Sequence, residues 1–223
     1  MDKFLKRKEA PESEDPDPPT TKARRGDGLC LVVLPGAGGS IAKNMNTMVL
    51  DPLEGMGFSV RRGSLKWNTF TAKHKDNVAA VLALCPSDKD FYVMGNSFGN
   101  RVIAEMMKAK LLPARCRGAV MCGFPLYGDK DKKDRLEQLQ GVPKDSTLML
   151  ISGTNDEFLN RDFLPVKGAA LLTSVLDDMK ITGRHEVHFI QGGKHDVPSA
   201  AGGKKVVDEA ATKVVNLVRD FCS

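Results

Sequence analysis

The sequence predicts an α/β fold in which a mostly parallel sheet of about six strands carries helices on both faces. Short apolar runs alternate along the chain with segments whose apolar residues recur at helical spacing. The first run, 29–34, is apolar throughout, as is typical of a strand covered on both sides. A Gly-x-Ser-x-Gly motif at 95–99 lies between an apolar run and a helical pattern, which is the setting of a nucleophile on a sharp strand-to-helix turn.

The predicted elements alternate in chain order. We expect strands at 29–34, 58–60, 91–94, 119–122, 147–151 and 186–190, each short, apolar and bounded by turn residues. We expect helices at 41–53, around 78–82, at 98–107, around 136–139, at 162–179 and at 204–221. In such a sheet, ligands bind beyond the carboxyl ends of the strands, where the polar loops gather.

The composition excludes several classes of protein. With 223 residues, 41% hydrophobic and 27% charged, the chain is suited to one well-formed core. The net charge of +5 is mild and its basic residues are mixed with acids, so nucleic-acid binding is not expected. No apolar run approaches the ~20 residues of a membrane span, and no secretory signal is expected. The cysteines are dispersed without a C-x-x-C pair, which indicates reduced thiols and neither a disulfide framework nor a zinc site.

The chain is expected to consist of a tail and one domain. Residues 1–27 are rich in Lys, Glu, Asp and Pro, which predicts a disordered tail, and residues 28–223 are expected to form the α/β domain. Reduced thiols favour the cytoplasm. Basic clusters at 6–8 and 22–25 leave a nuclear address open, although a solvated tail explains them more simply. The tail is also the segment expected to contact any protein partner.

Ser97 is the predicted nucleophile. The turn around it is so sharp that the residues two before and two after it, Gly95 and Gly99, must lack a Cβ. A serine hydroxyl attacks a carbonyl only if a base takes its proton and an acid orients that base. The alternative is a Gly-Ser turn that merely reverses the chain.

His195 is the predicted base and Asp156 the predicted acid. Of the four histidines, His195 alone follows a strand in a glycine-flanked loop. Asp156 also follows a strand, and the chain order Ser, Asp, His is that of α/β-hydrolases. Gly-Thr-Asn-Asp is good turn chemistry as well, so Asp196 is kept as the fallback acid, with the helical Asp177 and Asp178 less favoured.

The oxyanion that such an attack creates needs backbone donors. The N–H of Phe98, directly after the serine, is one expected donor, and the N–H of Ala37 in the Gly-rich loop after the first strand is the other. Gly36 and Gly38 let that loop approach the substrate closely. Trp67 and Phe124 are candidates for the lining of an apolar substrate pocket, although packing would explain both.

Five blocks, LPGAGGS, GNSFGNR, GFPLY, GTNDEF and GGKHD, in this order and spacing, resemble the small α/β-hydrolase-like family of testis-expressed protein thirty. That family includes the hydrolase-like domain of the third subunit of the NSL histone-acetyltransferase complex. The resemblance covers residues 29–221. It implies an α/β-hydrolase fold without the first two strands of larger hydrolases and without a cap domain, and it implies a nucleophile at Ser97, an acid at Asp156 and a base at His195. The sequence departs from the usual hydrolase pattern in two places. Pro35 stands where hydrolases usually have the His of a His-Gly pair, and Phe98 and Asn100 replace the small or Met residues that usually surround the second glycine of the motif.

The expected function is that of a serine hydrolase, similar to carboxylesterases or thioesterases, acting on a small-molecule ester, thioester or amide without a cofactor or metal. One alternative is a catalytically idle hydrolase fold that serves as an interaction module. Another is an NADP-dependent oxidoreductase, because Arg61 and Arg62 end the second strand where a 2′-phosphate would bind. Against that alternative, the G-x-G-x-x-G spacing fails at Ile41.

Overall fold

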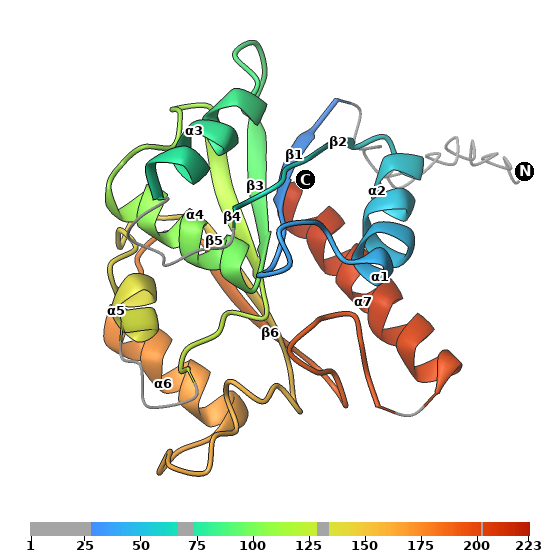
Figure 1. Ribbon diagram of the computed structural model, residues 1–223, viewed down its shortest axis with the longest axis vertical. Coiled ribbons are helices and arrows are strands. Elements are labelled where there is room, and N and C mark those ends of the chain that lie inside the picture. The colour runs from blue at the N-terminus through green and yellow to red at the C-terminus, as the bar shows by residue number, and fades with distance from the viewer. Residues whose placement is uncertain (1–27, 67–73, 129–133, 202) are drawn as a thin grey trace, which may run out of the picture.

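One sheet of six parallel strands lies at the centre of the computed structural model (Figure 1). The structure describes residues 28–66, 74–128, 134–201 and 203–223, so the predicted tail at 1–27 and Trp67 lie outside the described residues. The strands are β1 (Cys30–Leu34), β2 (Ser59–Arg62), β3 (Phe91–Asn96), β4 (Cys116–Cys122), β5 (Leu148–Gly153) and β6 (His185–Ile190). Each overlaps a predicted strand, and the expected fold class is confirmed.

The strand order β2-β1-β3-β4-β5-β6 contains one reversal of direction. The chain steps from β1 to one side to form β2, and then returns past β1 to form β3. In parallel sheets of this kind, ligands bind beyond the carboxyl ends of the strands at such a reversal. The register pairs Leu34 with Gly95, so the last residue of β1 lies beside the first glycine of the Gly-x-Ser-x-Gly motif.

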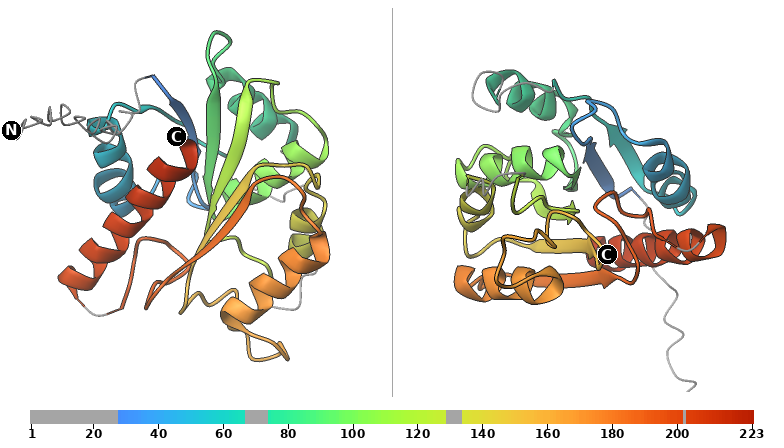
Figure 2. Two further views of the ribbon diagram at one scale, coloured as in Figure 1. Left: turned by 180° about the vertical axis from the view of Figure 1, so that it is seen from behind. Right: turned by 60° about the horizontal axis from the view of Figure 1, so that its bottom comes forward.

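Helices cover both faces of the sheet (Figures 1 and 2). On one face lie α3 (His74–Leu84), α4 (Phe98–Lys108), α5 (Asp134–Gln140) and α6 (Gly168–Met179). On the other lie α7 (Lys204–Cys222) and the helical segment formed by α1 (Lys43–Met45), the π-turn η1 (Asn46–Leu50) and α2 (Asp51–Gly55). The described connections between the strands contain these helices and loops but no inserted cap domain.

Two apolar clusters account for the continuous apolar character of the inner strands. Val32 and Val93 face the cluster under α3 to α6, while their neighbours Leu31 and Met94 face the cluster under α7. All four side chains are buried, because each strand has helices on both sides. Within the described ranges, no helix has both the length and the apolar character needed to cross a bilayer.

The helix predicted at 162–179 begins later than its sequence pattern indicates. α6 starts at Gly168, and the backbone of Lys167 is still extended, with φ −130° and ψ 162°. Leu164 precedes Pro165, and the proline ring disfavours helical geometry in the residue before it. Apolar spacing alone did not reveal this boundary.

Candidate active site

Ser97 lies on a strained turn between β3 and α4. Its backbone φ is 50° and its ψ is −107°, a conformation that residues with a Cβ rarely adopt. A Cβ at Gly99 would lie 2.7 Å from the carbonyl oxygen of Leu34 and 2.8 Å from that of Pro35, and a Cβ at Gly95 would overlap Asn100. Crowding by neighbouring backbone therefore explains both glycines of the motif.

Ser97, His195 and Asp156 are joined by hydrogen bonds although they are distant in sequence. The Nε2 atom of His195 is 2.8 Å from Ser97 Oγ, and its Nδ1 atom is 3.1 Å from each carboxylate oxygen of Asp156. Asp156 is fully buried, His195 is 8% exposed and Ser97 is partly exposed. When His195 carries its proton on Nδ1, it donates to Asp156 and accepts from the serine hydroxyl.

The backbone around Asp156 fixes the direction of its carboxylate. The N–H of Phe158 donates to Asp156 Oδ1 at 2.8 Å, and the side chain of Asn160 donates to the Asp156 carbonyl at 2.8 Å. These bonds hold the turn Gly-Thr-Asn-Asp in one shape. Asp156 can therefore belong both to a turn and to the candidate site, because the turn directs its carboxylate toward His195.

Two loops meet to bring Asp156 and His195 together. A Cβ at Gly153, the last residue of β5, would overlap the carbonyl of Gly193 in the loop after β6. The N–H of Asn155 donates to that carbonyl at 2.8 Å, and the N–H of Gly192 donates to Thr154 Oγ1 at 2.8 Å. The glycines thus allow the backbones of the loops after β5 and β6 to come into close contact, and the hydrogen bonds between the two loops stabilise this contact.

The Gly-rich loop after β1 lies beside Ser97. A Cβ at Gly36 would be 3.5 Å from Ser97 Cβ, and the N–H of Gly39 donates to the Gly36 carbonyl at 3.1 Å. Ala37 and Gly38 are exposed, and within the described residues the Ala37 N–H has no hydrogen-bond partner. Phe98, the other expected oxyanion donor, is the first residue of α4.

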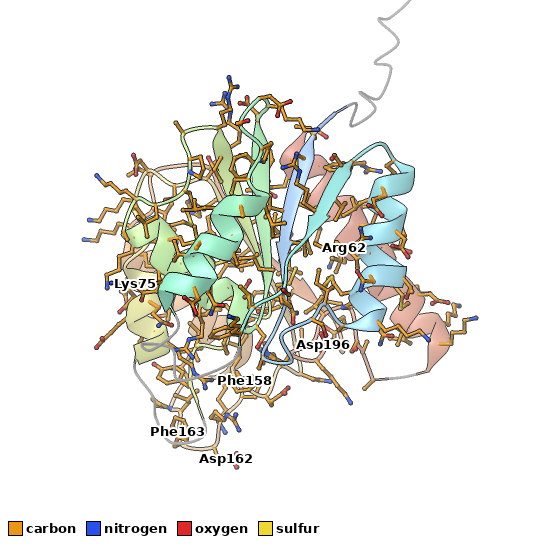
Figure 3. The ribbon with its side chains drawn as sticks, turned by 45° about the horizontal axis from the view of Figure 1, so that its top comes forward. Arg62, Lys75, Phe158, Asp162, Phe163 and Asp196 are labelled. Carbon is orange, nitrogen blue, oxygen red and sulfur yellow. The ribbon has the colours of Figure 1, made fainter. Side chains whose placement is uncertain are left out.

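Phe158 is a site residue that the sequence did not reveal. Its ring centroid lies 4.2 Å from that of His195, at an interplanar angle of 56°. The guanidinium carbons of Arg161 and Arg135 lie over this ring, at 4.7 and 5.5 Å from its centroid, respectively. Phe158 lies at the carboxyl edge of the sheet (Figure 3). The one sequence signal was its position two residues after Asp156, from which its N–H reaches back to the carboxylate.

Phe124, an expected lining residue, packs in the core. Its side chain is 1% exposed and belongs to the cluster under α3 to α6. Trp67, the other expected lining residue, lies outside the described residues.

Asp196, the fallback acid, does not take part in the hydrogen bonds of His195. Burial raises the pKa of the Asp196 carboxyl, the adjacent His195 lowers it and Glu157 raises it further. Its side chain also lies at the carboxyl edge of the sheet (Figure 3). The third and fourth candidates, Asp177 and Asp178, are in α6.

The two arginines that would bind a 2′-phosphate have other partners. Arg62 donates to Asn46 and forms ion pairs with Asp51 and Glu54, and Arg61 donates to the Leu84 carbonyl. Their neighbourhood therefore does not favour a dinucleotide. Among the described residues, no cluster of His, Cys, Asp and Glu is arranged to hold a metal ion.

Two surface grooves are remote from Ser97. One of about 780 Å³ runs along α7 between Lys204 and Asp220. Another of about 520 Å³ lies at the amino ends of β4 and β5, between Met107 and Thr147. Neither is lined by Ser97, His195 or Asp156, so groove volume does not locate the chemistry of this chain. The hydrogen-bonded side chains at the carboxyl edge are the better guide.

Comparison with known proteins identifies the family. A family model described as "Alpha/beta hydrolase domain" matches residues 58–223. This range includes Ser97, Asp156 and His195, but not β1 or the loop that contains Ala37. No curated protein gives a significant sequence match to the chain.

Solved structures with the same fold are distant in sequence. The monoacylglycerol lipase of Paleococcus ferrophilus is 11% identical, with 86% of this chain and 94% of that chain aligned and a TM-score of 0.57. Est1E from Butyrivibrio proteoclasticus is 12% identical over 89% and 90% of the two chains, with a TM-score of 0.55. DcsB, solved with a substrate analogue, is 13% identical over 88% and 90%, with a TM-score of 0.57. At such identities the likeness shows the fold.

Proposed function

Because the chain belongs to the alpha/beta hydrolase domain family, we propose that it is a serine hydrolase that cleaves an ester, thioester or amide through an acyl-enzyme. The observation that carries the proposal is the hydrogen-bond chain from Ser97 Oγ through the His195 imidazole to the buried Asp156. Strain supports it as well, because a turn that merely reverses the chain does not need a serine at φ 50°.

In the proposed acylation step, His195 Nε2 takes the proton of Ser97 as the hydroxyl oxygen attacks the carbonyl carbon of the substrate. Asp156 keeps the imidazole in the required tautomer and stabilises the imidazolium that forms. Because Asp156 is fully buried and hydrogen-bonded by the Phe158 N–H, its charge is held in place beside His195. The imidazolium then gives its proton to the leaving group as the bond to the carbonyl carbon breaks.

The oxyanion of the tetrahedral intermediate would be bound by backbone N–H groups. We assign these donors to Ala37, in the loop beside Ser97, and to Phe98, at the N-terminus of α4. In the second half of the reaction, His195 takes a proton from water, the hydroxide attacks the acyl-enzyme, and the proton returns to Ser97 as the acid product leaves.

The competing proposal is an idle hydrolase fold that serves as an interaction module. The resemblance of the five sequence blocks to the family of testis-expressed protein thirty and the NSL-complex subunit supports this alternative. The two proposals differ in one chemical property, since only an activated serine reacts with a phosphonylating probe.

Reaction of the full-length chain with a fluorophosphonate probe separates the two proposals. We expect the wild type to be labelled at Ser97 and the variants Ser97→Ala and His195→Ala to remain unlabelled, as detected by peptide mass spectrometry. Ser174→Ala, which removes a serine of α6, serves as the matched control and should be labelled like the wild type. An unlabelled, folded wild type would instead support the interaction module.

A further inference from the structure

Asn96, the residue before the proposed nucleophile, is partly buried, and its amide nitrogen has no hydrogen-bond partner among the described residues. Its Nδ2 atom is shielded from solvent, and it has no hydrogen bond within the part of the chain that the structure describes. Buried donors of this kind are rare, because leaving one unpaired costs stability.

The amide lies against the loop proposed to bind the oxyanion. A Cβ added at Gly36 would be 3.1 Å from Asn96 Oδ1 and 3.8 Å from the Asn96 carbonyl oxygen, so the Asn96 side chain lies close to Gly36. The contact follows from the topology. Leu34 pairs with Gly95, so the residues after β1 and the end of β3 leave the sheet side by side.

The space beside the amide is small and otherwise apolar. A cavity of about 10 Å³ is bounded by Gly36, Asn96, Ile41, Ala42 and Met45 among other residues, and Asn96 is the one described lining residue with a polar side chain. Such a volume holds about one water molecule. Because no other described lining residue has a polar side chain, a protein acceptor for the Asn96 amide has to be a backbone carbonyl, and this loop supplies one at Gly36.

The geometry of a peptide unit connects this amide to the oxyanion. The carbonyl of Gly36 and the N–H of Ala37 belong to the same planar unit and point in opposite directions. The Gly36 oxygen already accepts from the Gly39 N–H, and its second lone pair can accept from another donor. A donor on this oxygen polarises the unit and strengthens the Ala37 N–H as a donor at the other end.

We propose that Asn96 is a positioning residue whose amide donates to the Gly36 carbonyl as the oxyanion forms, and so holds and polarises the peptide that presents the Ala37 N–H. The proposal rests on the serine hydrolase function proposed above. It requires a rotation of the terminal amide that exchanges Oδ1 and Nδ2, a torsion with a broad energy profile. The unpaired donor of the free protein then finds its partner in the transition state, where a hydrogen bond accelerates the reaction.

Asn96→Leu is the informative variant, because it keeps the branched shape and removes the amide. We expect kcat for an activated ester to fall about tenfold while KM stays within about twofold, since the bond is made only in the transition state. The affinity for butylboronic acid, which forms a tetrahedral adduct with the serine, should fall by about the same factor as kcat. The Tm should stay the same or rise, because an unpaired buried amide has been removed.

Asn216→Ala on α7 is the matched control, and it should leave kcat, KM and boronate affinity unchanged. The proposal is overturned if Asn96→Leu keeps kcat within twofold of the wild type, or if Tm falls while boronate affinity stays the same, which would mark a structural role. Asn96→Ala should show the same loss of kcat. Because alanine is smaller than asparagine, this result would exclude steric strain from leucine as the cause. A wild type that neither turns over esters nor reacts with a fluorophosphonate would refute the hydrolase function itself, and this inference with it.

Discussion

Two aspartates near His195 have different surroundings. Asp156 is fully buried, accepts a backbone N–H and lies 3.1 Å from the imidazole, whereas Asp196 follows His195 in the chain and has no hydrogen bond to its ring. Orientation of the imidazole is therefore assigned to Asp156. Asp196 contributes at most a through-space attraction to the imidazolium, which is weaker than a bond that fixes the tautomer.

The two carboxylates can be compared directly by amide substitution. We expect Asp156→Asn to lower kcat by roughly 10³- to 10⁴-fold, because the amide favours the wrong tautomer of His195. Asp196→Asn should keep kcat within about tenfold, because only a partly screened charge is lost. Steady-state kinetics on one activated ester measures both. Equal losses in the two variants would show that the acid has been assigned to the wrong residue.

Single residues differed in how well their role could be predicted from sequence. Ser97, Asp156 and His195 could be proposed because each carries a reactive group and lies in the segment after a strand, and the topology brings such positions to one edge. Phe158 and Asn96 could not be, because their contacts depend on how two loops pack against each other. The packing of Phe124 in the core also could not be predicted, because an aromatic residue after a strand can enter the core as readily as a pocket.

At the scale of elements, the strand-turn-helix unit of β3 and α4 depends on close contact with the end of β1. The Cα of Gly99 lies where any side chain would meet the carbonyls of Leu34 and Pro35, which are backbone atoms that cannot rotate away. Gly55, at the end of α2, has open space around it. The two glycines thus offer a matched pair for substitution.

Gly99→Ala should lower the free energy of unfolding by about 1–3 kcal/mol, because the added methyl group forces backbone shifts in a packed region. Gly55→Ala should raise it by about 0.4–1 kcal/mol, because alanine restricts the unfolded chain without a clash. Urea denaturation measures both changes. A neutral effect of Gly99→Ala would mean that β1 and α4 are not in contact as described.

The edge strand β2 is tied to α2 by charged side chains. The pKa of Glu54 is lowered chiefly by the hydrogen bond from Arg62; burial raises it, and the charge of Arg62 lowers it. A carboxyl whose pKa is lowered in the folded protein stabilises it above the unfolded pKa, and this contribution is lost as pH falls through the folded pKa. Because the side chain of Glu54 is 40% exposed, solvent screens the pair and its contribution is small.

The free energy of unfolding of Arg62→Gln should therefore be lower than that of the wild type at neutral pH, by no more than about 1 kcal/mol. We expect this difference to shrink steadily once the pH falls below the ordinary glutamate pKa of 4.5, and to shrink also in high salt. Lys205→Gln, whose nearest carboxylate is 4.0 Å away on an exposed helix face, should show no such trend. A difference that persists unchanged at acidic pH would refute the ion pair.

Element types could be predicted from the sequence better than element ends. All six strands and the helices on both faces followed from apolar runs and periodicity, because burial on two sides leaves a strong signal in β1, β3, β4 and β5. The start of α6 at Gly168 and the π-turn η1 did not follow, because local proline geometry and packing against α7 decide them.

At the scale of the whole molecule, the strand order gives the site its place. The reversal between β1 and β3 makes these two strands neighbours, and the groups in the proposed reaction come from the carboxyl edge of the sheet. Ser97 follows β3, Asp156 follows β5, His195 follows β6 and Ala37 follows β1. A sheet without that reversal would not place the loop after β1 beside the nucleophile.

The central claim, that Ser97 carries the acyl group during turnover, can be tested by trapping that intermediate. The full-length protein is mixed with a 4-nitrophenyl ester, quenched in acid within the first turnover, and examined by intact and peptide mass spectrometry. We predict a burst of nitrophenolate and an acyl adduct on Ser97, both lost in Ser97→Ala. Hydrolysis by Ser97→Ala at the wild-type rate, or turnover with the acyl group on another residue, would contradict the claim.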